Sequence, residues 1–185
     1  MSRPATQLTA MSPEAYLEME RSSPLKHEYV AGQVFAMTGT SVVHNVILGN
    51  LYIALRSHLK GTPCRVFMAD VKLKVEAADA FYYPDLMVTC EPAPDSHYRQ
   101  QPTLVVEVLS ESTAAYDAGA KRLDYQKLES LQEYLLVAQE CMDIRLYRRE
   151  QERWRMTVFT DGAVIPLQSV GMEIPIEAVY EEVWQ

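Results

Sequence analysis

Two acidic residues in the middle of the chain stand inside apolar segments. Asp85 follows Tyr82-Tyr83-Pro84 and precedes Leu86-Met87-Val88, and Glu107 interrupts the apolar run 104–109. An ionised carboxylate within a buried strand costs several kcal/mol unless a cation compensates its charge. Neighbouring strands can place the two carboxylates side by side, so the pattern predicts that Asp85 and Glu107 share one divalent cation.

The residue types predict metal-assisted hydrolysis of a phosphate ester. Mg²⁺ prefers hard oxygen ligands, usually from one or two carboxylates, and keeps waters in its other positions. Asp85, Glu107 and the carbonyl group of Val108 would meet that demand for Mg²⁺ or Mn²⁺. The ion would polarise a phosphoryl oxygen and lower the pKa of a bound water, and Lys121 would hold that water. Ion pairs with Lys121 and Arg122, or backbone donors, are the structural alternative for both acids.

Four further residues are candidates for a supporting role. Tyr125 shares a helix face with Lys121 by i, i+4 spacing. Glu28 is either a solvated strand residue or an acid that points at the site. His44 begins an amphipathic helix and is either a hydrogen-bonded packing residue or a group aimed at the site. Asp70 either caps a turn or adds an acid to the metal pocket.

Length and charge bound the class of protein. At 185 residues with 48% apolar residues, the chain suits a single domain, 1–185, with residues 1–11 as a short N-terminal arm. Its formal net charge of −8 gives no broad basic footprint, which counts against a nucleic-acid substrate. A local groove or a bound divalent ion can reverse the sign of the potential near a site, so such a substrate is not excluded.

The cysteines and the apolar runs indicate a cytoplasmic protein. No apolar run approaches the roughly 20 residues of a membrane span, and the N-terminus lacks the apolar core of a signal peptide. Cys64, Cys90 and Cys141 are odd in number and widely spaced, which favours neither a disulfide framework nor a structural zinc site.

Hydrophobic spacing and turn residues predict a mixed succession of helices and strands. Ser12 caps a helix that ends near Glu20, and Ser41 caps a second helix that ends near Leu59. Pro84 lacks a backbone N–H and places the strand 81–89 at a sheet edge or a bulge. The other predicted elements are a hairpin over 26–37, strands over 65–68, 71–75, 104–109, 133–137 and 142–147, a helix from about 113 to 130, a charged turn over 148–153, a terminal hairpin of 154–159 with 163–167, and a closing helix or turn over 175–183.

One set of segments, taken together, carries a family resemblance: Tyr83-Pro84-Asp85, the stretch from Glu107 to Thr113, Asp117 with Lys121, Tyr125, residues 11–17 and 28–32, His44-Asn45, and Glu133-Tyr134. The chain resembles the Uma-two family of endonucleases, a branch of the PD-(D/E)XK, restriction-endonuclease-like superfamily. By this resemblance Asp85 supplies the motif's Asp and Glu107 its Glu. The superfamily's usual Lys, two positions after the Glu, is Leu109 here; in this branch it comes from the following helix, where Lys121 fits.

The expected fold is α/β and restriction-endonuclease-like, with a central mixed β-sheet flanked by helices in an α-β-β-β-α-β core and extra terminal hairpins. The expected activity is metal-dependent hydrolysis of phosphodiester bonds, most simply in DNA. We also expect a homodimer, because cutting two strands gains from two-fold symmetry and the terminal hairpins offer edges for pairing. Two alternatives are a non-catalytic nucleic-acid-binding or assembly module on this fold, and a hydrolase of a small phosphorylated molecule.

Overall fold

A computed structural model of the protein describes residues 11–37, 39–92, 97–111 and 113–184. The predicted N-terminal arm lies outside this part of the chain except for Met11. Helix α1 (Pro13–Ser22) begins where predicted, because the side chain of Ser12 accepts a hydrogen bond from the backbone N–H of Ala15 at 3.2 Å. It continues two residues beyond the predicted end at Glu20.

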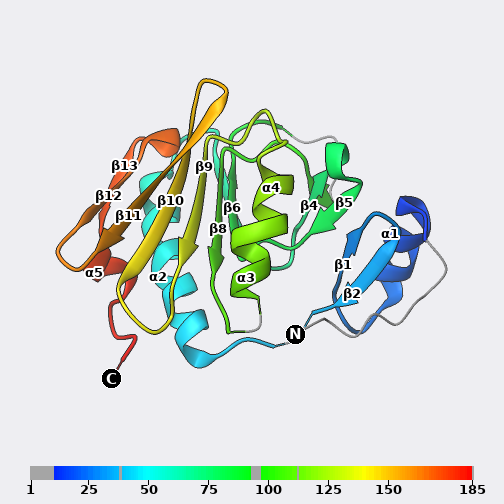
Figure 1. Ribbon diagram of the computed structural model, residues 1–185, viewed down its shortest axis with the longest axis horizontal. Coiled ribbons are helices and arrows are strands. Elements are labelled where there is room, and N and C mark those ends of the chain that lie inside the picture. Colours follow the sequence, from blue (N-terminus) through cyan, green and yellow to red (C-terminus); the bar gives the residue numbers. More distant parts are fainter. Residues whose placement is uncertain (1–10, 38, 93–96, 112, 185) are drawn as a thin grey trace.

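A six-stranded mixed sheet forms the centre of the molecule, in the order β11-β10-β9-β8-β6-β3 (Figure 1). β8 and β9 are parallel, and the other neighbouring strands are antiparallel. β6, β8 and β9 are buried along their whole length, as expected for strands covered on both faces. The strands are β3 (Arg65–Met68), β6 (Leu86–Thr89), β8 (Leu104–Val108), β9 (Glu133–Val137), β10 (Asp143–Glu150) and β11 (Arg153–Thr160).

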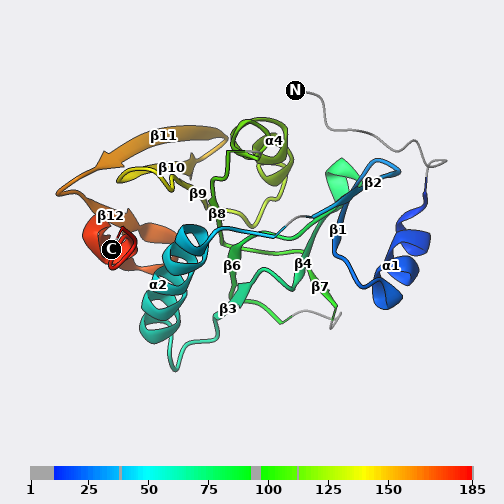
Figure 2. The ribbon, with the colours of Figure 1, turned by 90° about the horizontal axis from the view of Figure 1, so that it is seen from below.

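Helices cover both faces of this sheet (Figure 2). α2 (Val42–His58) lies on one face; α3 (Ala114–Tyr116), a π-helical turn (Asp117–Lys121) and α4 (Arg122–Tyr125) lie on the other. Along this sheet α2, β3, β6, β8, the second helical segment and β9 follow one another in the predicted α-β-β-β-α-β order. The predicted fold class is therefore confirmed, although the second helix ends at Tyr125 rather than near residue 130.

A second, five-stranded sheet has the order β2-β1-β5-β4-β7. The strand predicted over 81–89 is in fact two strands, since β5 belongs to this sheet and β6 to the central one. The chain crosses between the sheets at Tyr83-Pro84-Asp85, where Pro84 cannot donate to a strand ladder. Asp85 therefore lies at the junction of the two sheets. The strands here are β1 (His27–Val30), β2 (Gln33–Ala36), β4 (Lys72–Val75), β5 (Ala80–Tyr82) and β7 (Tyr98–Arg99), with a 3₁₀ turn at Glu76–Ala78.

The C-terminal strands pair differently from the prediction. β10 and β11 form one hairpin, and β12 (Val164–Leu167) and β13 (Met172–Pro175) form another, so the predicted pairing of 154–159 with 163–167 was wrong. The charged turn predicted over 148–153 is shorter than predicted: it consists of Gln151 and Glu152, between β10 and β11, and Arg148 and Arg149 lie within β10. Glu133 and main-chain carbonyl groups satisfy their guanidinium groups there. A 3₁₀ turn (Gln168–Val170) joins β12 to β13, and α5 (Ile176–Val179) is the predicted closing helix.

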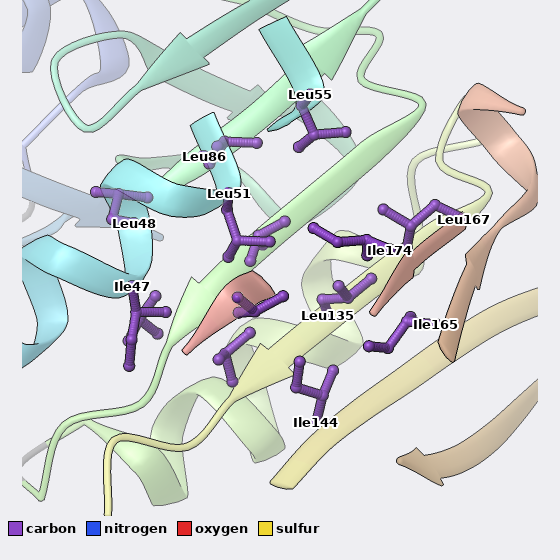
Figure 3. Packing of buried hydrophobic residues seen from close by; sticks show 14 of the residues in the cluster. Ile47, Leu48, Leu51, Leu55, Leu86, Leu135, Ile144, Ile165, Leu167 and Ile174 are labelled. Atoms are coloured by element: carbon purple, nitrogen blue, oxygen red, sulfur yellow. The ribbon is translucent and has the colours of Figure 1, made fainter. Parts of the chain in front are cut away.

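The main hydrophobic core fixes α2 against the central sheet (Figure 3). Ile47 and Leu51 of α2 belong to the same buried cluster as Leu135 and Ile144 of the sheet. β12 and β13 add Ile165 and two further side chains, Leu167 and Ile174, to this cluster. The packed core thereby sets where the first turn of α2, with His44, lies relative to β6 and β8.

Cys64 and Cys90 form a disulfide between the ends of β3 and β6, so the prediction that the cysteines form no disulfide was wrong for this pair. Spacing along the chain gave no sign of it because the two residues are 26 positions apart and meet only when β3 and β6 pair. The disulfide removes the cysteine argument for a cytoplasmic protein. Within the described residues, we find no helix with the length and apolar character that crossing a membrane requires.

Candidate active site

Asp85 connects the start of β6 to the end of β8 and to the start of α2. Its Oδ2 atom accepts a hydrogen bond from the backbone N–H of Val108 at 2.8 Å and lies 3.1 Å from Nε2 of His44. The side chain of Asp85 is 17% exposed, more than those of its charged neighbours described below. The carboxylate is thus held in place by two groups and still reachable from solvent.

Glu107 lies next to Asp85 on the neighbouring strand. Its Oε2 atom accepts a hydrogen bond from the backbone N–H of Asp85 at 3.2 Å, and its Oε1 atom accepts one from the hydroxyl of Tyr125 at 2.9 Å. Each of the two acids therefore accepts a hydrogen bond from the backbone of the other's segment, which is the backbone-donor alternative that the sequence left open. The shared divalent cation stays a prediction.

Lys121 brings its ammonium group to Glu107 from the helical segment that follows β8. Its Nζ atom lies 2.9 Å from Oε1 of Glu107, 3.0 Å from Oε1 of Glu28 and 3.6 Å from Oδ1 of Asp117. Glu28 comes from β1, so the cluster joins the five-stranded sheet to the central one. The side chain of Lys121 is only 6% exposed, which makes this a buried ion cluster rather than a surface salt bridge.

A kinked helical segment carries Lys121 and its buried neighbours Asp117 and Tyr125. Asp117, Lys121 and Tyr125 follow one another at i, i+4 spacing. In a regular α-helix such side chains drift around the axis by about 40° per step. Here a kink at Gly119, whose φ of −107° and ψ of −105° are not helical, separates Asp117 from Lys121, and all three side chains are buried, with Lys121 and Tyr125 in contact with Glu107.

Asp117 joins the cluster although it was not among the candidate site residues. Its place in the family-like motif and its i, i+4 spacing from Lys121 were the available signals. Four carboxyl groups thus surround one ammonium group and one imidazole. That excess of negative charge in a buried place is what a bound cation would relieve.

The electrostatics of the cluster shift several pKa values. Burial raises the pKa of Glu107 well above its usual range; Lys121 opposes this shift and the charges of Asp85 and Asp117 add to it. Burial likewise raises the pKa of Asp117. Burial alone would lower the pKa of Lys121, but Glu107, followed by Tyr125, Glu28 and Asp117, raises it well above the ordinary lysine value. Lys121 is therefore an ammonium group at neutral pH.

His44 is fixed by the capping of α2. The side chain of Ser41 accepts a hydrogen bond from the backbone N–H of His44 at 3.0 Å, and Ser41 also bonds to Gln139 at the end of β9. Nε2 of His44 faces Asp85, whereas its buried Nδ1 atom has no hydrogen-bond partner among the described residues. A proton on Nε2 satisfies this arrangement, because Nε2 can donate it to the Asp85 carboxylate, whereas a proton on Nδ1 would be a buried donor without an acceptor among the described residues.

The structure brings most of the predicted site residues together. Those in the cluster are Asp85, Glu107, Lys121, His44, Glu28 and Tyr125, with Val108 at its edge. Asp70 lies apart: it forms an ion pair with Lys26, and its side chain is 78% exposed.

The oxygen donors present fit Mg²⁺ or Mn²⁺. Among the described residues, no three or more His, Cys, Asp and Glu side chains are arranged to hold an ion together. The adjacent carboxylates of Asp85 and Glu107 are two oxygen-donor side chains, one of them partly open to solvent at Asp85. One or two carboxylates, completed by backbone oxygen and water, are the usual protein ligands of Mg²⁺.

Comparisons with known proteins identify the family and the fold. A family model described as "Uma2: Putative restriction endonuclease" matches residues 13–177. The crystal structure of a "putative nuclease belonging to DUF820" from Anabaena variabilis superposes with a TM-score of 0.78, covering 94% of this chain and 99% of that chain. The two sequences are 17% identical, so this likeness shows the shared fold.

Two proteins of Synechocystis sp. are similar in sequence. Uncharacterized protein slr1290 is 35% identical over 180 residues, which cover 96% of this chain and 95% of the relative. Uncharacterized protein sll1609 is 31% identical over 147 residues, which cover 77% of this chain and 83% of that protein.

Proposed function

Because the chain belongs to the Uma2 family, we propose that it is a metal-dependent endonuclease that hydrolyses phosphodiester bonds in DNA. The observation that carries this proposal is the contact of Lys121 with Glu107 beside Asp85 in one cluster that is buried but open at Asp85. Two adjacent carboxylates and an ammonium group are the set that metal-assisted phosphoryl chemistry requires.

Each residue has a defined role in this proposal. Asp85, Glu107 and the carbonyl group of Val108 hold Mg²⁺ or Mn²⁺. The ion, when bound, supplies a polarised phosphoryl oxygen and a water of lowered pKa. Lys121, which is charged at neutral pH, stabilises the negative charge that develops on the phosphoryl group.

The remaining residues position these groups. His44 donates to Asp85 and fixes its carboxylate, and Tyr125 donates to Glu107. Glu28 and Asp117 hold the ammonium group of Lys121 through ion pairs.

The test is cleavage of plasmid DNA with Mg²⁺ or Mn²⁺ present. We expect Glu107→Gln and Lys121→Met to lower the rate by at least about 100-fold, the size of losing one charge-stabilising group. Asp70→Asn is the matched control, since it changes an acid that lies outside the cluster. Equal nicking by the wild type and the two cluster variants would refute the assignment.

The acidic balance of the chain favours one alternative substrate class. A net charge of −8 repels a small phosphorylated molecule less than a long polyanion. Comparing turnover of a nucleotide diester with turnover of an oligonucleotide distinguishes the two, because an endonuclease turns over the oligonucleotide faster. Binding of Mn²⁺ without any hydrolysis would instead indicate a non-catalytic module.

We also propose that the protein acts as a homodimer joined through sheet edges. β2 and β11 each pair with a neighbour on one side only among the described strands. Two-fold pairing of such edges would place two sites in antiparallel relation, as cutting both strands of a duplex requires. A monomeric mass by light scattering at micromolar concentration would contradict the dimer.

A further inference from the structure

A cross-strand row leads from the candidate site to the edge of the central sheet. Glu107 on β8 pairs with Leu136 on β9, which pairs with Arg145 on β10, which pairs with Val158 on β11. Residues in one row of a sheet point to the same face. Arg145 therefore shares the face of Glu107 and lies two strands away, about 10 Å at the ordinary strand spacing.

This face is open over β10 and β11. Figure 2 shows α4 beside these two strands rather than over them. The side chain of Arg145 is 46% exposed, and Met156 and Val158 on β11 are 48% and 46% exposed. We call this part of the sheet the open face. Arg145, Met156 and Val158 are exposed on it, whereas Tyr147, Arg149 and Trp154 at its inner side are partly buried.

Arginine side chains give the open face a fixed positive charge. The guanidinium group of Arg122, from α4, lies 5.0 Å from the ring centre of Tyr147, and that of Arg149 lies 4.6 Å from the ring centre of Trp154. Arg149 also donates to three main-chain carbonyl groups, so its charge cannot move away from the face.

Arg145 differs from the other two arginines because it can reach a ligand. Its Nε atom lies 3.3 Å from Oδ1 of Asp143, a partly exposed pair that leaves guanidinium N–H groups toward solvent. Arginine in such a position binds phosphate oxygens through two parallel hydrogen bonds.

The hairpin that carries the open face is basic within an acidic protein. Residues 143–160 contain five arginines and three acidic residues, in a chain with 17 basic and 25 acidic side chains. Three of the five arginines, Arg148, Arg153 and Arg155, point to the opposite face from Arg145. The hairpin as a whole still carries more positive than negative charge, which favours the approach of a polyanion.

We propose that the open face is where a DNA strand lies as it enters the site, with Arg145 bound to a phosphate near the one that is cleaved. This inference rests on the proposed nuclease function and names the surface that holds its substrate. Phosphate contacts from Arg145 position the strand, and the exposed apolar side chains of Met156 and Val158 pack against its sugars or bases.

A second copy of the chain fits the open face less well. Two-fold pairing of a patch with itself brings identical residues close together. Arg122, Arg145 and Arg149 would then face their own copies, and such like-charge contacts cost several kcal/mol. A DNA strand supplies the opposite charge.

The experiment measures binding of fluorescein-labelled DNA, as single strand and as duplex, by fluorescence anisotropy with EDTA present so that no strand is cut. We expect Arg145→Glu to weaken binding about tenfold, and Arg145→Gln to reduce the slope of log affinity against log salt by about 1. Arg155→Glu is the matched control. It makes the same change on a neighbouring strand, at a 69% exposed side chain that points to the opposite face.

A second measurement separates this inference from the proposed function. Hydrolysis of bis(p-nitrophenyl) phosphate with Mn²⁺ needs the metal and Lys121 but not the open face, so Arg145→Glu is expected to leave it unchanged. If the wild type did not hydrolyse this diester, the proposed nuclease function would be refuted. The result on DNA binding at the open face would not be affected. Equal effects of Arg145→Glu and Arg155→Glu on DNA affinity, or no DNA binding by the wild type, would overturn the inference. So would a change of oligomeric mass in Arg145→Glu with unchanged DNA affinity, because the face would then belong to a second copy.

Discussion

The ammonium nitrogen of Lys121 lies 2.9 Å from Oε1 of Glu107 in the interior of the protein. Three carboxylates contact this one lysine, so removing it leaves buried negative charge without a partner. The same contact therefore contributes to the stability of the fold and to the proposed chemistry of the site.

Lys121→Met is expected to lower the free energy of unfolding by about 3 kcal/mol, because breaking a buried ion cluster strands its remaining charges. The control is Lys127→Met, which removes a 45% exposed lysine paired with Asp124 and should change stability by less than about 0.5 kcal/mol. Urea denaturation measures both. Similar losses for the two variants would mean that Lys121 is not part of a buried cluster.

The free energy of unfolding is expected to fall as the pH rises from the ordinary glutamate pKa of about 4.3 to the raised pKa of Glu107. Within that window the folded chain holds a proton that the unfolded chain has released, so folding becomes less favourable with increasing pH. Lys121 makes the free energy of unfolding depend on pH in the same direction at alkaline pH. The stability that its charge provides is lost as the pH rises through its raised pKa.

Denaturation of the wild type and of Glu107→Gln across this range tests the acidic window. The free energy of unfolding of the wild type should decrease with pH relative to that of the variant. Added Mn²⁺, which binds the ionised form of Glu107, should move this decrease to lower pH. Parallel curves for the two proteins would show that Glu107 does not titrate with a raised pKa.

Asp85→Asn is expected to weaken Mn²⁺ binding at least tenfold, because it removes one of the two carboxylate ligands of the proposed site. Asp117→Asn is the comparison: Asp117 contacts Lys121 rather than the proposed ion position, so it should retain Mn²⁺ affinity and lose turnover instead. Isothermal titration calorimetry measures the affinities. Loss of Mn²⁺ binding in Asp117→Asn alone would place the ion elsewhere in the cluster.

His44→Ala is expected to reduce the rate of DNA cleavage about tenfold, since the hydrogen bond that fixes Asp85 is lost. His44→Gln retains a donor and should recover much of the rate. This rescue distinguishes a positioning residue from a general base, because glutamine cannot accept a proton at neutral pH. Equal loss in both variants would favour the general base.

Reduction of the Cys64–Cys90 disulfide is expected to lower the free energy of unfolding by about 3 kcal/mol, the entropic cost of releasing a loop of this length. Cys64→Ser should have the same effect, and dithiothreitol should then change nothing further. Cys141→Ser, at an exposed free cysteine, is the control. Thiol titration of the unfolded, unreduced protein should find one free thiol, and three would show that the disulfide does not form.

Much of the fold followed from local features of the sequence. The N-caps Ser12 and Ser41, the turn at Ala31-Gly32 and the apolar runs around Glu107 set the helices and strands nearly where the structure has them. Capping and hydrophobic periodicity act over a few residues, so a single sequence reveals them.

The misplaced elements are those whose state depends on distant partners. The local charge pattern predicts a solvated turn at Arg148 and Arg149. In the structure these arginines lie in a strand, where Glu133 and the carbonyl groups near residues 126–131 accept their hydrogen bonds. The Cys64–Cys90 pair likewise meets only through the registry of β3 with β6.

The sequence by itself determined which residues could do the chemistry, because Asp85 and Glu107 stand in segments that must be buried and therefore need compensating charge. Only the tertiary structure decided how they are compensated. It placed Glu28 and Asp117 against Lys121 and left Asp70 outside with Lys26. The physical reason is that burial is encoded locally by apolar neighbours, whereas the partner of a buried charge is chosen by strand pairing and helix packing across the whole chain.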